Sequence, residues 1–143
     1  MRKQTTKRVY GIGVDICNIR RMYEKISTHG DDFAKKILTT YEYRTYEDMT
    51  DRTKQAQYVA KCWAVKEAFV KALGIGFNGN FMWSDVGYLS PKGSLTGVCH
   101  PRVNLSEDAY HDPMMQNKVV HLSVSDEVDN AIAFVTIEEV KNV

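Results

Sequence analysis

Two acidic side chains and one basic side chain have types and surroundings that could support metal-assisted phosphate chemistry. Asp15 lies in VYGIGVDI (9–16), and Glu67 and Lys71 lie four residues apart in AKCWAVKEAFVKALGIG (60–76). If Asp15 and Glu67 face one another, their oxygens could hold a hard cation such as Mg²⁺, which commonly keeps waters and substrate phosphate oxygens in its shell. Lys71, one helical turn from Glu67, would then place positive charge where a phosphate or leaving oxygen needs it.

The same residues also have simpler interpretations. A glutamate and a lysine at this spacing form a common pair on a helix surface, and the pair stabilises an isolated helix by only about 0.2–0.5 kcal/mol. An aspartate at the end of a strand often caps a turn or the helix that follows. The metal site is therefore a hypothesis that depends on whether the fold brings the two segments together.

The segment that carries Asp15 has the period of a strand. Residues 9–16 alternate between two sets: Tyr10, Ile12, Val14 and Ile16 on one face, and Gly11, Gly13 and Asp15 on the other. An alternation of this kind predicts a β-strand. Because the glycine face has no bulk, another backbone or a ligand can approach it closely.

The segment that carries Glu67 and Lys71 has the period of a helix. Residues 51–73 repeat apolar side chains at spacings of three and four on two stripes, which predicts a long and largely buried helix. On a helical wheel, Ala60 and Ala64 are the neighbours of Glu67 and Lys71. Small residues in these places leave a groove beside the two charged side chains.

The remaining segments indicate a mixed fold. They comprise helices over 18–29 and 31–49, a loop GIGFNGN (74–80) that begins at a C-cap glycine, strands near 85–89 and 94–99 joined by the turn SPKG, and a hairpin of 119–124 and 131–137 around SDEVDN. Because helices and strands do not alternate regularly, the predicted class is α+β, with a small, mostly antiparallel sheet and a long buried helix. No linker or repeat divides the chain, so residues 9–143 should form a single domain, preceded by a basic, solvated tail at 1–8.

Composition excludes several classes of function. The 143 residues are 43% hydrophobic and 26% charged, with 19 basic against 18 acidic side chains. Near-zero net charge argues against a bulk nucleic-acid binder. The longest apolar run, Ala131–Val135, is far shorter than the roughly 18 residues that span a bilayer. Three separated cysteines (Cys17, Cys62 and Cys99) fit reduced thiols in a cytoplasmic protein better than a disulfide framework.

Four segments of the chain carry a family resemblance. They are GIGVDICNIRRM (11–22), FAKKILTTYE (33–42), AKCWAVKEAFVKALGIG (60–76) and HLSVSDEVDNAIAFVTIEE (121–139). In this order and spacing they resemble the holo-acyl-carrier-protein synthases. The resemblance implies a cytoplasmic 4′-phosphopantetheinyl transferase of fatty-acid synthesis. Such an enzyme moves phosphopantetheine from coenzyme A to a serine of an apo acyl carrier protein and releases adenosine 3′,5′-bisphosphate. It also implies the family fold, a small α+β domain, assembled as a homotrimer with active sites between neighbouring subunits.

The resemblance also implies roles for individual residues. Asp15 and Glu67 are similar to the family's magnesium ligands, and Lys71 is similar to the lysine that contacts the transferring phosphate. A carboxylate or a metal-bound water would take the serine proton, and Glu67 is the preferred base, directly or through a water. The expected coenzyme contacts are Lys66, Lys71, Gly74, Gly76 and Ser123, and the expected docking positions for the acidic carrier protein are Arg21, Phe33 and Lys36. A solvated amphipathic surface is the alternative interpretation of the docking positions.

Four positions depart from the family pattern: Cys62, Asp126, Asp32, which replaces a basic residue near the docking helix, and Ile75, which replaces the usual threonine of the glycine loop. Cys62 stands where many relatives have an arginine, so one coenzyme phosphate contact is either missing or supplied by Lys61 or Lys66, and Cys62 itself is interpreted as a small buried hydrophobe. Asp126 stands where many members have a histidine and would repel a phosphate there. An alternative function is a non-catalytic trimeric adaptor that binds acidic proteins through a basic helix. A metal-dependent nucleotide hydrolase using the same carboxylates is a third possibility.

Overall fold

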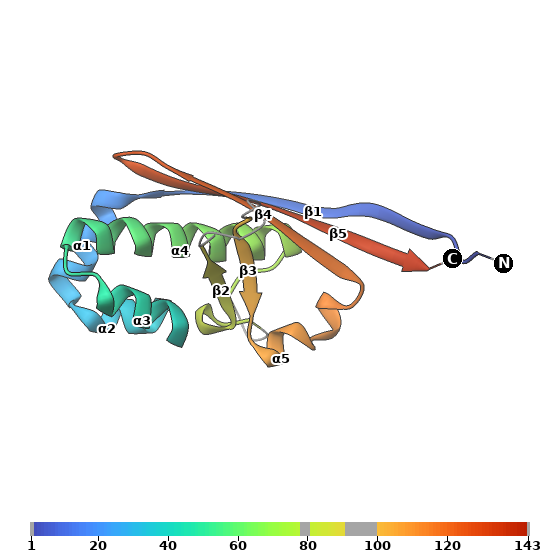
Figure 1. The fold of residues 1–143 in the computed structure, drawn as a ribbon, viewed down its shortest axis with the longest axis horizontal. Coiled ribbons are helices and arrows are strands. Elements are labelled where there is room, and N and C mark those ends of the chain that lie inside the picture. The colour runs from blue at the N-terminus through green and yellow to red at the C-terminus, as the bar shows by residue number, and fades with distance from the viewer. Residues whose placement is uncertain (1, 78–80, 91–99, 143) are drawn as a thin grey trace, which may run out of the picture.

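A long antiparallel sheet runs along one long helix in the computed structural model, which describes residues 2–77, 81–90 and 100–142 (Figure 1). In chain order the elements are β1 (Thr5–Asn18), α1 (Ile19–His29), α2 (Asp31–Ile37), α3 (Thr40–Asp48), α4 (Arg52–Leu73), η1 (Trp83–Asp85), β2 (Val86–Leu89), β3 (Arg102–Leu105), α5 (Glu107–Tyr110), η2 (Pro113–Met115), β4 (Lys118–Asp126) and β5 (Asn130–Asn142). Its strands pair in the order β1-β5-β4, and β2 and β3 form a separate antiparallel pair. The predicted α+β class, the antiparallel sheet, the long helix and the terminal hairpin are confirmed.

Strand β1 rests directly on the backbone of α4. A Cβ atom added to Gly11 would lie 1.9 Å from the carbonyl oxygen of Ala72, and one added to Gly13 would lie 2.0 Å from that of Ala68. Only glycine allows two backbones to approach this closely. The predicted close approach to the glycine face is therefore made by the helix itself.

The predicted helix over 31–49 is wrong in one respect, because it is two helices. The chain leaves the helical conformation at Leu38 and Thr39, and α3 begins at Thr40. Thr39 accepts a hydrogen bond from the Glu42 backbone N–H at 3.2 Å, and the Glu42 carboxylate accepts one from the Thr39 N–H at 2.9 Å. This reciprocal capping box defines a helix start inside what reads as one continuous segment.

The prediction of a solvated tail over residues 1–8 is also wrong in part. Residues Thr5–Arg8 belong to β1 and pair with the end of β5, where Thr5 faces Asn142 across the ladder. Arg8 donates to the Glu139 carboxylate at 3.3 Å. The side chains are exposed, as expected of a tail, but the backbone extends the sheet beyond α4 (Figure 1).

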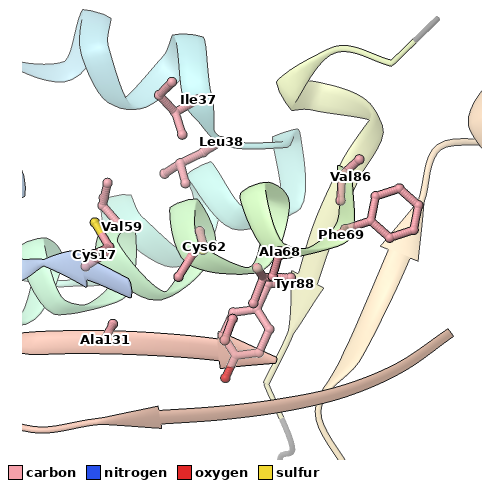
Figure 2. Packing of buried hydrophobic residues seen from close by; sticks show 14 of the residues in the cluster. Cys17, Ile37, Leu38, Val59, Cys62, Ala68, Phe69, Val86, Tyr88 and Ala131 are labelled. Carbon is pink, nitrogen blue, oxygen red and sulfur yellow. The ribbon is translucent and has the colours of Figure 1, made fainter. Parts of the chain in front are cut away.

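The core lies between α4, the inner face of the sheet and the small β2–β3 pair. Figure 2 shows Cys62 and Ala68 of α4 packed in the same interior as Val86 and Tyr88 of β2 and Cys17 of β1. Helix α4 buries side chains around most of its circumference, as predicted. Among residues 2–77, 81–90 and 100–142 there is no helix long and apolar enough to cross a membrane. The predicted strand at 94–99, most of the SPKG turn and Cys99 lie outside the described residues.

Large apolar side chains cover the outer face of the sheet, which is turned away from α4. Their exposed fractions run from 40% to 62%: Tyr10, Ile12, Val14, Ile16, Ile132 and Phe134. Six side chains of this size on adjoining strands form an apolar patch of the kind that marks an interaction site. We refer to these six residues as the outer patch.

Candidate active site

Asp15 and Lys71 form the centre of the candidate site. The close contact of β1 with Ala68 and Ala72 brings Asp15 beside the last turns of α4. The Lys71 ammonium donates to Asp15 Oδ1 at 2.9 Å and to the carbonyl oxygen of Val14 at 3.1 Å. The Asp15 side chain is only 14% exposed whereas that of Lys71 is 51% exposed, so the pair opens to solvent on the lysine side.

Glu67 shares the electrostatic environment of this pair. Partial burial raises the pKa of the Glu67 carboxyl group above its ordinary value, and the negative charge of Asp15 raises the pKa further. The positive charge of Lys71 opposes both effects. The structure thus brings together the three residues that the sequence singled out, with two carboxylates close enough for their charges to interact.

The two carboxylates suit a divalent cation. Asp15 Oδ2 is buried and has no hydrogen-bond partner among the residues that the structure describes, an arrangement that costs free energy unless something else contacts the oxygen. Within that same part of the chain no group of three or more histidine, cysteine or acidic side chains is placed to hold a metal. A two-carboxylate site fits Mg²⁺, which usually takes one or two protein carboxylates and fills its shell with waters and substrate phosphates.

The loop after α4 begins with a glycine in the left-handed conformation. Gly74 has φ 79°, and its N–H donates to the carbonyl oxygen of Lys71 at 3.0 Å, closing the helix next to the site. A Cβ atom added to Gly76 would meet no atom within 4 Å. Gly74 is thus explained by the helix end, while the predicted contact of both glycines with a coenzyme stays a prediction.

A row of stacked aromatic rings lies next to Glu67, and sequence reasoning missed most of it. Trp63, one helical turn before Glu67, stacks on Phe33 at 6.4 Å and on Trp83 at 4.4 Å, and Trp83 stacks on Phe77 at 4.2 Å between ring centroids. We call these four residues the aromatic row. One signal was present in the sequence, since Trp63, Glu67 and Lys71 recur every four residues and so share one face of the helix.

Two of the three predicted docking residues meet at the aromatic row. The Arg21 guanidinium lies 5.8 Å from the centre of the Trp63 ring, on which Phe33 also stacks. Lys36 is exposed on α2, the short helix that also carries Phe33. Arg21 and Phe33 are therefore brought together beside the candidate site, and Lys36 lies on the surface of a neighbouring turn.

The prediction that Lys66 contacts a coenzyme phosphate is wrong. Lys66 is completely buried, and its ammonium donates to the carboxylate of Glu42 at 2.7 Å. It also donates to the carbonyl oxygens of Trp83 and Val86. Its side chain leaves α4 toward the core while that of the adjacent Glu67 leaves toward Asp15, because successive residues of a helix point about 100° apart.

Ser123 lies on the opposite face of the sheet from Asp15 within one chain. It is exposed on β4 and pairs across the ladder with Phe134 of the outer patch, which in turn faces Val14. Asp15 faces Ala133, which is completely buried against the helix. A single chain therefore does not bring Ser123 to the carboxylates.

Cys62 and Asp126, two of the positions that depart from the family pattern, have well-defined surroundings. Cys62 is completely buried, and burial raises the pKa of its thiol well above the usual value, as expected for a small core hydrophobe. Asp126 lies 3.8 Å from the Lys61 ammonium, which partly offsets its charge. Lys61 is thus engaged with Asp126 at the tip of the β4–β5 hairpin.

Comparisons with known proteins agree on one family. Residues 11–111 match the 4′-phosphopantetheinyl transferase superfamily. The holo-[acyl-carrier-protein] synthase of Delftia acidovorans is 35% identical over 133 residues, which cover 91% of this chain and 97% of the relative.

Two solved structures show the same architecture. The crystal structure of holo-[acyl-carrier-protein] synthase from Neisseria meningitidis superposes with a TM-score of 0.77 at 31% identity, over 91% of this chain and 98% of that one. A holo-(acyl-carrier-protein) synthase from Bacillus anthracis in complex with CoA (3′,5′-ADP) superposes with a TM-score of 0.69 at 27% identity, over 92% of this chain and 97% of that one.

Proposed function

The chain belongs to the 4′-phosphopantetheinyl transferase superfamily, and from that premise we propose that it is a holo-[acyl-carrier-protein] synthase. It transfers 4′-phosphopantetheine from coenzyme A to a serine of an apo acyl carrier protein. The serine oxygen bonds to the phosphorus that bears pantetheine, the pyrophosphate P–O bond breaks, and adenosine 3′,5′-bisphosphate leaves as the serine loses its proton. The observation that carries the proposal is the convergence of Asp15, Glu67 and Lys71 at one place.

Asp15 and Glu67 would hold Mg²⁺, and the unpartnered Oδ2 of Asp15 is the atom that most needs such a contact. A bound Mg²⁺ would supply charge neutralisation at the pyrophosphate. Lys71, half exposed beside these carboxylates, is free on its solvent side to bind the phosphate that is transferred and to offset the charge that builds on the leaving bisphosphate. Glu67 would accept the serine proton, directly or through a water.

The carrier protein would dock on α1 and α2. Arg21 and Lys36 provide positive charge, and Phe33 provides an apolar anchor in the aromatic row one turn from Glu67. An acidic helix is the partner that fits this combination. Charge complementarity of this kind raises the rate of encounter more than the final affinity.

A homotrimer is part of the same proposal. The outer patch gives each chain an apolar surface suited to burial against another copy. Ser123 lies on that outer side of the sheet, so the coenzyme that it contacts would be one bound at the carboxylates of a neighbouring subunit. We further place the enzyme in the cytoplasm, in fatty-acid synthesis, where the free thiols Cys17 and Cys62 would remain reduced.

The decisive experiment is to incubate the chain with an apo carrier protein, coenzyme A and Mg²⁺ and to weigh the carrier. A gain of about 340 Da, the mass of the phosphopantetheine group, supports the transferase. Binding of the carrier without a gain in mass would instead identify an adaptor. Release of adenosine 3′,5′-bisphosphate from coenzyme A with no carrier present would identify a hydrolase.

A further inference from the structure

The buried ammonium of Lys66 has a complete set of acceptors. Its three N–H groups match the Glu42 carboxylate at 2.7 Å, the Trp83 carbonyl at 3.1 Å and the Val86 carbonyl. An ammonium has three donors and no acceptor, so this arrangement leaves nothing unpaired. Lys66 is thereby tied at once to α3, to η1 and to the start of β2.

Glu42 completes the same network from the other side. One carboxylate oxygen accepts from Lys66 and from the Thr39 N–H at 2.9 Å, and the other accepts from the Tyr88 N–H at 2.7 Å. Both Glu42 and Lys66 are completely buried. A buried ion pair contributes little net stability compared with apolar residues of the same size, because both charges must be desolvated. The presence of the buried Glu42–Lys66 pair is therefore not explained by stability alone.

The network connects the candidate active site to the aromatic row. Lys66 is the residue before Glu67 on α4, so fixing its side chain fixes the rotation of the turn that presents Glu67 to Asp15. The carbonyl that Lys66 holds belongs to Trp83, whose ring is stacked between Trp63 and Phe77. The Lys66 ammonium therefore fixes the position of both the helical turn that carries Glu67 and the aromatic side chains next to it.

We propose that Lys66, paired with Glu42, is a positioning residue. It holds the helical turn that carries Glu67 and the aromatic row in the relative positions that phosphopantetheine transfer requires. It touches no substrate and acts through Glu67 and Trp83. This inference rests on the proposed transferase function for its kinetic part. Its structural part can be measured without any activity.

The experiment compares Lys66→Met, Glu42→Gln and the double variant with the unmodified chain. Each single change leaves one buried charge unpaired and should lower stability strongly, whereas the double change removes both charges and should regain much of that loss. Stability is measured by urea unfolding, and kcat and the carrier KM by transfer of phosphopantetheine. The near-neighbour stacking of Trp63 and Trp83, the only two tryptophans in the chain, is followed as an exciton couplet in circular dichroism. Ile137→Ala, in the buried face of β5, is the control for destabilisation alone.

We expect kcat and folding stability to respond differently to these substitutions. Lys66→Met and the double variant should both lose about tenfold or more in kcat, with a carrier KM within about twofold and a weakened couplet, because small shifts of a reacting group are costly. The control should keep its couplet and its kcat while it remains folded. Recovery of kcat and couplet together with stability in the double variant would overturn the proposal, as would an unchanged couplet in Lys66→Met. An unmodified chain without transfer activity would instead refute the proposed function, and the couplet would still decide whether Lys66 holds the aromatic row.

Discussion

Replacing Gly13 by alanine should disable the enzyme without altering any residue that touches a substrate. The added Cβ would lie 2.0 Å from the carbonyl oxygen of Ala68 and 2.7 Å from the backbone nitrogen of Ala72, where ordinary contacts begin at 3.4 Å. Both obstacles are backbone atoms of α4, so β1 must retreat by about 1 Å or more, as close-packed interiors do not yield locally. Asp15, two residues further along β1, moves with it.

The expected effects follow from that displacement. Forcing extra volume into a packed contact costs about 1–3 kcal/mol of folding stability. A shift of about 1 Å in a reacting geometry can cost on the order of 100-fold in rate. Strand propensity alone predicts the opposite sign for stability, because glycine is about 0.5–1 kcal/mol less favourable than alanine in a strand. The direction of the stability change is therefore informative in itself.

The assay is the rate of phosphopantetheine transfer at several Mg²⁺ concentrations, measured beside urea unfolding. Val135→Ala is the matched control, because Val135 is buried in β5 directly opposite Gly13 and its truncation leaves β1 seated on the helix. Gly13→Ala should require more Mg²⁺ and turn over far more slowly than the control at equal stability. Full activity in a folded Gly13→Ala chain would refute the view that the close contact of Gly13 with the α4 backbone positions Asp15.

Three further outcomes are expected. Lys71→Ala should lower kcat strongly with little change in carrier binding by calorimetry, since Lys71 contacts Asp15 and the open side of the site; equal loss of both would assign Lys71 a structural role. Phe33→Ala and Lys36→Glu should raise the carrier KM with kcat nearly unchanged, and only the Lys36→Glu effect should fade at high salt; unchanged KM values would move docking elsewhere. The metal-free chain should lose stability as pH rises from about 4.3 through the raised pKa of Glu67, because the folded form binds that proton more tightly than the unfolded form. Urea unfolding in EDTA at several pH values should show a smaller fall of the unfolding free energy with pH in Glu67→Gln than in the unmodified chain. An identical fall in both chains would contradict the raised pKa.

The sequence predicted the parts of the fold that depend on local pattern. Alternation over 9–16 predicts β1, and the glycine face predicts that something approaches it closely. The apolar stripes over 51–73 and the glycine after Leu73 predict α4 and its end. The break between α2 and α3 was missed, although Thr39 and Glu42 have the spacing of a capping box.

The direction of Lys66 could not be predicted, for a physical reason. Helix α4 is buried on most sides, so its pattern does not distinguish a charged side chain that faces solvent from one that enters the core. The partner that makes burial possible, Glu42, lies 24 residues earlier in a separate helix. Similarly, the placement of Ser123 on the opposite face from Asp15 depends on strand order and register, which follow from the whole sheet.

The proposed mechanism requires Asp15 and Glu67 to bind one divalent ion beside the pyrophosphate of coenzyme A. The most direct test is a crystal of the chain grown with coenzyme A and Mn²⁺, in which anomalous scattering locates the metal. We expect one ion bonded to an oxygen of each carboxylate at about 2.0–2.3 Å, with phosphate oxygens in the same shell and Lys71 turned from Asp15 to a phosphate. An ion bound to only one of these carboxylates, or to neither, with the coenzyme in place, would contradict it.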